Sequence, residues 1–139
     1  MTLVARLAVS AVFFAALFVA PTAEATEVLY YKPGGGTCSI SVPTPYYWTD
    51  GTGTSSTAWV KCDVSTYVKI QNHFQRWDGY SWSTIVVGTP SQGWSNHSLI
   101  QSSVSTSPRT CGIIRAAAVV IMDGVRRDIY SNNIKVCNA

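Results

Sequence analysis

The side chains best suited to acid–base chemistry near neutral pH are two histidines, His73 and His97. Nucleophilic catalysis needs a base beside the nucleophile and a third group that orients the base. His73 lies in an alternating polar run with Gln71 and Gln75, and His97 lies in a predicted loop. Because serines are abundant, a serine near either histidine is expected by chance. The pattern favours solvent-facing histidines over a triad, and the sequence predicts no enzyme.

The carboxylates fit turns better than catalysis. Asp50, Asp78 and Asp123 each precede a glycine, and Asp-Gly is a pair that tight turns favour. Nothing in the spacing of the other acids forces two of them together, as glycosidase chemistry would require. Those acids are Glu27, Asp63 and Asp128. Neither C-x-x-C nor H-x-x-x-H spacing occurs, so the sequence predicts no metal site and no cofactor.

Aromatic residues are the more informative group, because the chain holds five tryptophans and seven tyrosines. Several flank the predicted turn at Asp78-Gly79, where rings and amide groups could stack on and bind a sugar ring. The competing interpretation is aromatic pairing across a hairpin, which needs no ligand. Alternation places Trp59 on the face of its strand opposite Val60 and Cys62, where it is partly exposed or covered by a loop. The side chains predicted to bind a ligand are Trp59, Gln75, Trp77, Tyr80, Trp82 and Trp94.

These side chains must be positioned by hairpins, and the clearest hairpin is the last third of the chain. Asp123-Gly124 separates two extended runs between Cys111 and Cys137. Asp and Gly tolerate the positive φ of a tight turn, so this pair is a strong hairpin signal. Folding about the turn places Cys111 opposite Val136, or opposite Cys137 when one residue is bulged.

The rest of the chain alternates apolar and polar residues with a period of two, which is typical of half-buried strands. Glycine, proline and Asp-Gly pairs interrupt it at short intervals and leave no room for helices. Residues 67–77 are the longest central strand candidate, and residues 88–96 are predicted to be a loop. The expected strands are residues 28–31, 38–42, 58–64, 67–77, 80–86, 99–104, 112–122 and 125–137. This pattern predicts an all-β chain of six to eight antiparallel strands in a two-sheet β-sandwich.

The four cysteines, Cys38, Cys62, Cys111 and Cys137, allow three disulfide pairings. In one arrangement Cys38–Cys62 and Cys111–Cys137 each close a hairpin, and a one-residue bulge absorbs the mismatch with each turn centre. In the other, Cys62 pairs with Cys111 across the two sheets, with Trp77 against the bridge. Arg109 then stands where a tyrosine usually accompanies such a bridge. The turn positions favour the first arrangement, and the second stays open.

The first 25 residues are predicted to be a cleaved signal peptide. Arg6 precedes an apolar run over residues 7–20, and Pro21 precedes the small-x-small site at residues 23–25. The run is short for a membrane span and no basic cluster follows it, so no span is expected in the mature chain. Residues 26–139 are predicted to form one β-sandwich domain with two disulfides, secreted to an oxidising compartment.

The net charge of +3 is too small and too dispersed for a nucleic-acid partner. The only adjacent basic residues are Arg126 and Arg127, and strand alternation sends their side chains to opposite faces. Nucleic acid is therefore not expected to be a partner.

The last hairpin also carries a resemblance. The pattern consists of Cys111, Gly112, a strand with Arg115, a turn, and residues 130–132 before the last cysteine. It resembles small secreted β-sandwich proteins of actinobacteria, which end in a similar hairpin. A tyrosine often precedes the strand arginine in those proteins, where this chain has Ile114. The resemblance implies an immunoglobulin-like sandwich and an extracellular location, and it carries no catalytic residue.

These features together predict a secreted, non-enzymatic binding domain whose partner is an extracellular protein or a cell-envelope glycan. An alternative is a secreted bacteriocin-like toxin or protease inhibitor that acts through a loop such as residues 88–95. A small hydrolase built on a histidine is the least favoured hypothesis.

Overall fold

The computed structural model describes residues 25–107 and 111–137, in which strands are joined by turns and loops and no helix occurs. The predicted signal peptide, residues 1–25, lies outside the described residues except for Ala25, the first residue of a strand. Within the described part of the chain, no helix is long and apolar enough to cross a membrane.

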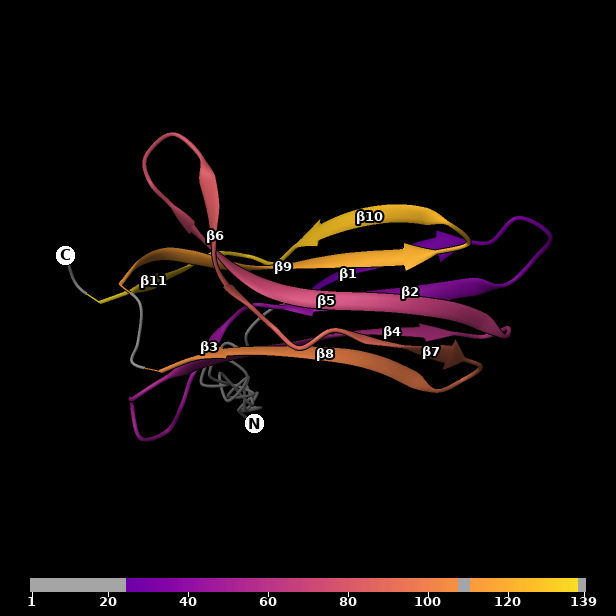
Figure 1. Cartoon of the computed structure of the whole chain (residues 1–139), viewed down its shortest axis with the longest axis horizontal. Helices are drawn as coiled ribbons and strands as arrows, with labels where there is room; N and C mark the ends of the chain where they lie inside the picture. The colour runs from indigo at the N-terminus through magenta and orange to yellow at the C-terminus, as the bar shows by residue number, and fades with distance from the viewer. Residues whose placement is uncertain (1–24, 108–110, 138–139) are drawn as a thin grey trace, which may run out of the picture.

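The strands form two antiparallel sheets that face each other (Figure 1). Sheet A runs in the order β1, β2, β4, β8, with the short β3 continuing beside β4 beyond the end of β2. Its strands are β1 (Ala25–Tyr31), β2 (Thr37–Pro43), β3 (Tyr46–Tyr47), β4 (Thr54–Cys62) and β8 (Leu99–Thr106).

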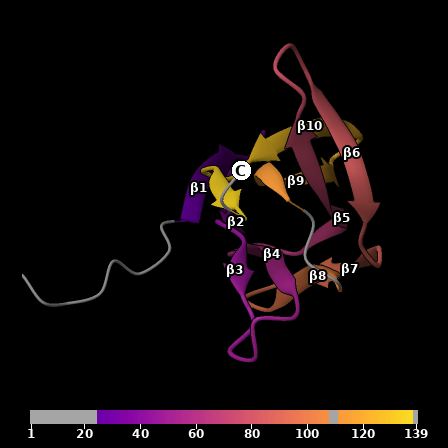
Figure 2. The same cartoon turned by 90° about the vertical axis from the view of Figure 1, so that its left-hand side faces the viewer.

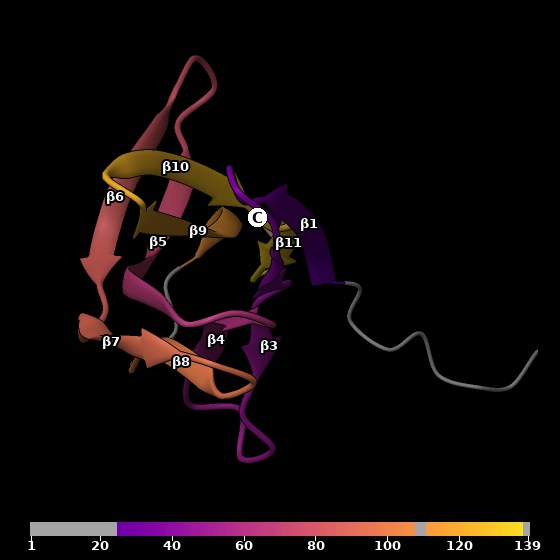
Figure 3. The same ribbon diagram turned by 90° about the vertical axis from the view of Figure 1, so that its right-hand side faces the viewer.

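Sheet B is built on β5 and β9, which pair along nearly their whole length. β6 and β7 follow one another along the free edge of β5, and β10 and β11 do the same along β9. The strands of sheet B are β5 (Thr66–Trp77), β6 (Trp82–Val87), β7 (Ser91–Ser95), β9 (Gly112–Met122), β10 (Val125–Tyr130) and β11 (Ile134–Val136). The end-on views show most of sheet B above β3, β4 and β8, with β7 lying low beside β8 (Figures 2 and 3).

The chain crosses between the sheets from β4 to β5, from β7 to β8 and from β8 to β9. This connectivity, with β4 between β2 and β8 and with β9 between β5 and β10, is that of an immunoglobulin-like sandwich. The predicted fold class is therefore confirmed. Eleven strands are present in the described residues rather than six to eight, because short segments such as β3, β7 and β11 pair separately.

Both disulfides close hairpins, as the turn positions favour. Cys38 lies directly opposite Cys62 in the β2–β4 register, and the two are bonded. The second bridge joins Cys111 to Cys137. The competing bridge between Cys62 and Cys111 is wrong, because each of these cysteines has its partner in its own hairpin.

The final hairpin contains the one-residue slip that its bridge needs. β10 pairs with β9 in the register of a two-residue turn at Asp123-Gly124, with Val125 opposite Met122. β11 is shifted by one residue, so that Val136 lies opposite Gly112 and the cysteines next to them meet. The predicted single strand over residues 125–137 is therefore wrong, because the slip divides it into two.

The core lies between the sheets and follows the period of two. In β5 the even-numbered residues from Thr66 to Phe74 are buried, and in β9 the even-numbered residues from Ile114 to Met122 are buried opposite them. Asn72 is the polar exception on this face of β5. Its side-chain nitrogen donates to the carbonyl and the hydroxyl of Ser56 in sheet A, both at 3.1 Å. The buried amide thus links the two sheets without an unpaired polar group.

Three local predictions need correction. Residues 88–96 were expected to form a loop, but Ser91–Ser95 is strand β7, held by pairing with β5. The strand predicted over residues 58–64 begins earlier and ends at Cys62 as Thr54–Cys62. The turn at Asp78-Gly79 is a four-residue loop, because Trp77 lies opposite Trp82.

Candidate binding surface

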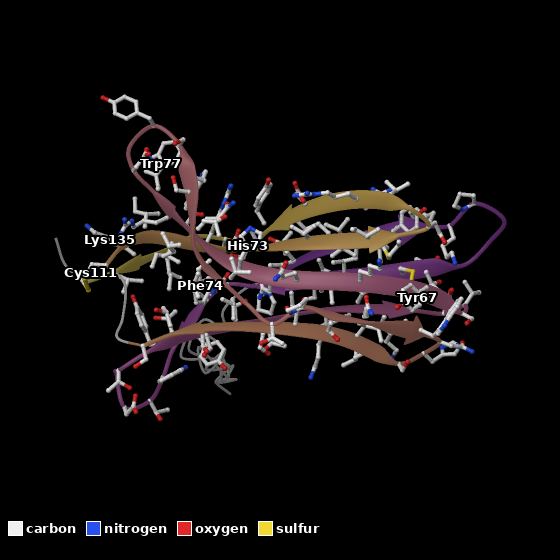
Figure 4. All side chains as sticks on the ribbon, viewed as in Figure 1. Tyr67, His73, Phe74, Trp77, Cys111 and Lys135 are labelled. Carbon is white, nitrogen blue, oxygen red and sulfur yellow. A yellow bond between two sulfur atoms is a disulfide. The ribbon has the colours of Figure 1, made fainter. Side chains whose placement is uncertain are left out.

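The surface of interest is the outer face of sheet B, which is formed by the odd-numbered residues of β5 and β9 and their neighbours. Because successive side chains alternate, the buried even-numbered residues of these strands force the odd-numbered ones outwards. This outer face comprises Tyr67, Lys69, Gln71, His73, Gln75 and Trp77 of β5 and Ile113, Arg115, Ala117, Val119 and Ile121 of β9. Figure 4 shows Tyr67 and Trp77 at opposite ends of β5, with His73 between them.

At one end of this face, Arg115 is held between two aromatic rings. Its guanidinium carbon lies 4.1 Å from the ring centre of Trp82 and 3.9 Å from that of Tyr130. Its Nε donates a 2.9 Å hydrogen bond to Oε1 of Gln75. Partial burial lowers the pKa of the Arg115 guanidinium, but arginine remains charged in proteins. The cation is therefore fixed by stacking and by one hydrogen bond instead of by a carboxylate.

Trp77 extends this cluster outwards. It lies directly opposite Trp82 in the β5–β6 register, and their ring centres are 5.4 Å apart with the planes tilted by 51°. The two rings line a shallow depression of about 290 Å³ together with Ile113 and Asn133. Trp77 is 37% exposed, so part of its ring is available to a ligand.

The β5–β6 hairpin continues past the cluster as an arm that rises from the body of the molecule (Figure 1). In the loop at its tip, Oδ1 of Asp78 accepts hydrogen bonds from the backbone nitrogens of Tyr80 and Ser81 at 2.7 and 2.8 Å. Bonds from the backbone of Ser81 and then of Tyr80 lower the pKa of the Asp78 carboxyl group. Tyr80 lies at the tip and is 93% exposed, so it is separate from the stacked rings.

The other end of the outer face carries a second aromatic pair. Trp94 of β7 lies opposite Tyr67, and the two rings meet edge to face with their centres 5.4 Å apart. Trp94 is 64% exposed. Trp94 was expected in a loop, whereas β7 holds it on the same sheet face as Trp77.

Two adjoining depressions lie between the aromatic ends. One, of about 430 Å³, is lined by residues that include Gln71, Gln92 and Val119, and the other, of about 340 Å³, reaches Tyr67 and Trp94. Both are lined by Lys69 and Ile121, so they form one open groove along β5. Its floor includes apolar side chains such as Val119 and Ile121. Its rim carries amides, the ammonium groups of Lys69 and Lys32, and the carboxylate of Asp123.

The structure brings together only some of the predicted ligand-binding residues. Gln75, Trp77 and Trp82 meet in one cluster, and Trp94 lies at the far end of the same face. Trp59 lies on the outer face of sheet A, on the other side of the sandwich.

Sequence reasoning missed Tyr67, Lys69, Arg115 and Tyr130. The turn at Asp123-Gly124 does set Tyr130 opposite Ala117, two residues along β9 from Arg115. That register was available from the sequence and would have placed Tyr130 beside the arginine.

The two histidines and two of the buried serines are held by packing or by hydrogen bonds to the backbone. His73 is half-buried, and this burial lowers the pKa of its imidazole. His97 lies in a tight loop with a φ of 61°, where its backbone nitrogen donates to the carbonyl oxygen of Cys62. The buried hydroxyls of Ser95 and Ser102 each accept a bond from a backbone N–H and donate to a backbone carbonyl. Within residues 25–107 and 111–137, no group of three potential ligands could hold a metal ion.

Comparisons of the chain with protein-family models, with curated proteins and with solved structures found no match. The resemblance of the last hairpin to small secreted actinobacterial proteins therefore stays a prediction. The connectivity of the sheets defines the fold, and the rings and groove on the outer face of sheet B form the candidate binding surface.

Proposed function

We propose that the chain is an exported, non-enzymatic binding module that holds a saccharide chain along the outer face of sheet B. The observation that carries the proposal is the row of exposed and half-buried polar side chains of β5 between two aromatic ends. Tyr67 and Trp77 are ten residues apart on β5, a span of about 33 Å at about 3.3 Å per residue. This span suits an extended polymer better than a small molecule.

The chemistry of the surface supports a saccharide. A sugar ring offers C–H groups on its face and hydroxyls around its rim, so it pairs with an aromatic ring flanked by hydrogen-bonding groups. Trp77 and Trp94 supply exposed rings, and Gln92 and Lys69 on the groove supply donors and acceptors. The two disulfides are consistent with an extracellular protein, which would meet such polymers.

No observation favours the alternative of a toxin or inhibitor that acts through residues 88–95. Most of that segment is strand β7. The residues before it are held by backbone bonds from Gly88 to Asn72 and from Thr89 to Ser103, so the segment does not project as a loop.

Binding of cell-wall and plant polysaccharides, measured by affinity electrophoresis and calorimetry, tests the proposal. Trp94→Ala removes a ring that is 64% exposed, so folding should be preserved. We expect its affinity to fall about tenfold, which corresponds to about 1.4 kcal/mol of stacking. Trp77→Ala should weaken binding at the other end of the face.

Trp59→Ala is the matched control, because it removes a tryptophan from the opposite side of the sandwich. It should bind as the wild type does. Equal losses in all three variants, or a wild type that binds no polysaccharide, would overturn the proposal.

A further inference from the structure

We infer that the saccharide bound by this face is a polyanion, with carboxylate or sulfate groups spaced along its chain. This inference rests on the proposed function. It starts from the charges on the outer face of sheet B, where four cationic side chains accompany one carboxylate. The cations are Lys69, Arg115, Arg126 and Lys135, and the carboxylate is Asp128.

The register fixes which way these side chains point. Arg126 and Asp128 lie opposite Ile121 and Val119, and Lys135 lies opposite Ile113. Directly opposed residues share a sheet face, so all three point outwards with their partners on β9. Figure 4 shows Lys135 near the end of the sheet that carries Trp77.

Pairing leaves three of these cations without a carboxylate. Arg126 and Asp128 form an ion pair at 3.1 Å. At the far end of the groove, Lys32 and Asp123 also pair, at 3.6 Å, and add no net charge. The carboxylate of Asp78 is occupied by donors in its own loop. Lys69, Arg115 and Lys135 have no ion-pair partner in the part of the chain that the structure describes.

The positive charge is concentrated on this one face. The described residues include eight basic and six acidic side chains. With four of the basic and one of the acidic residues on the outer face of sheet B, the rest of the described chain carries one net negative charge. An anionic ligand is therefore attracted to this side of the sandwich and not to the other.

The spacing of the three cations without a carboxylate partner indicates a polymer of moderate charge density. Lys69 is six residues along β5 from Gln75, the partner of Arg115, which is about 20 Å. Lys135 lies opposite Ile113, which in turn lies opposite Trp77, so Lys135 is about 7 Å beyond Gln75 along the direction of β5. One small anion cannot reach all three. A nucleic-acid duplex, with a charge about every 1.7 Å, would leave most of its phosphates unpaired.

Two pairs of polymers with the same backbone test the inference. Polygalacturonate is compared with its methyl-esterified form, and dextran sulfate is compared with dextran, so that carboxylate and sulfate are probed separately. We expect the wild-type protein to bind at least one charged polymer about tenfold more tightly than its neutral counterpart. Raising the salt concentration from about 50 to about 200 mM should weaken that binding several-fold.

Lys69→Gln removes the cation that lines both depressions and should weaken binding to the charged polymer about fivefold. Lys69→Arg should restore it. Lys61→Gln, which changes an exposed lysine on the outer face of sheet A, is the matched control and should have no effect.

The outcomes separate this inference from the proposed function. Equal affinity for the charged and neutral forms overturns the polyanion inference and leaves saccharide binding in place. Binding to none of the four polymers, nor to any in the wider panel, removes both. Tighter binding to single-stranded DNA than to either charged polymer overturns the inference in favour of nucleic acid.

Discussion

His73 stands in the middle of the outer face of sheet B, between Ala117 of β9 and Val87 of β6. Burial lowers the pKa of its imidazole from the ordinary value of 6.5, and the opposing field of Asp128 is the next largest influence. Arg126 and Arg115 lower the pKa further, while a backbone hydrogen bond at Gln71 raises it. The folded protein therefore prefers the neutral imidazole.

This shift predicts a pH dependence of stability. Above pH 6.5 the imidazole is neutral in both the folded and unfolded chains and contributes no difference. As the pH falls below 6.5, the unfolded chain takes up the proton first, so the free energy of unfolding decreases until the folded pKa is reached. In His73→Gln this decrease should be absent from urea titrations carried out below pH 6.5.

His97→Gln changes an exposed loop residue and serves as the control, which should retain the decrease seen in the wild type. A His73→Gln protein with the same pH profile as the wild type would show that burial of His73 does not govern this range.

Among the elements, the β5–β6 arm is linked to β9 and β10 by the stacked side chain of Arg115. Trp82 belongs to the arm, Tyr130 belongs to β10, and the guanidinium of Arg115 lies between their rings. Arg115→Met keeps a long apolar side chain but loses the charge and the bond to Gln75. It should lower the free energy of unfolding by about 1–2 kcal/mol and speed hydrogen exchange in β6.

Arg126→Met is the matched control for this prediction, because Arg126 makes only an exposed ion pair with Asp128. It should cost less than about 0.5 kcal/mol and leave exchange in β6 unchanged. If both variants loosen the arm equally, the stacked arginine does not hold it.

Local elements were predictable where a turn sets the register. Asp123-Gly124 fixes Val125 opposite Met122. In the same way, folding the chain about Asp50-Gly51 predicts the pairing of Cys38 with Cys62 to within one residue. β7 was missed because glycine and proline surround it and because its pairing partner is β5, which no tight turn connects to it. Such strands form through tertiary pairing and leave little local signal.

The candidate surface was only partly predictable for the same reason. The hairpin sequence places Gln75, Trp77 and Trp82 near one another. Arg115 joins them only because β5 pairs with β9, and no tight turn sets that register across the long intervening segment. Trp59 is the opposite case. Alternation predicted correctly which face of its strand Trp59 occupies, but it could not predict that this face lies on the other side of the sandwich.

At the scale of the whole molecule, the two outer faces differ although they share one core. The outer face of sheet A carries small hydroxyl side chains, such as Thr57 and Ser103, which are hydrogen-bonded at 2.7 Å. The outer face of sheet B carries rings and cations. Because the core constrains only the inward residues, the outward positions of each sheet are free to take on a separate role.

The two disulfides stabilise this architecture unequally. They close loops of similar length, with sequence separations of 24 and 26, so their effects on the unfolded chain should be alike, at about 3.5 kcal/mol each. Cys38 and Cys62 are fully buried, whereas Cys111 is exposed. The double variant Cys38→Ala/Cys62→Ala should therefore lose more stability in urea unfolding, because it also leaves a cavity.

The double variant Cys111→Ala/Cys137→Ala is the comparison, and it should lose less. A larger loss from this pair would mean that the end of the last hairpin contributes more to the fold than the buried bridge.

The separation of the two aromatic ends also makes the length of a ligand part of its recognition. An oligomer too short to reach from Trp94 to Trp77 engages one end at a time. Once a chain reaches both, the second contact becomes intramolecular and its effective concentration rises sharply. The module would then discriminate by degree of polymerisation, favouring intact strands over their breakdown fragments.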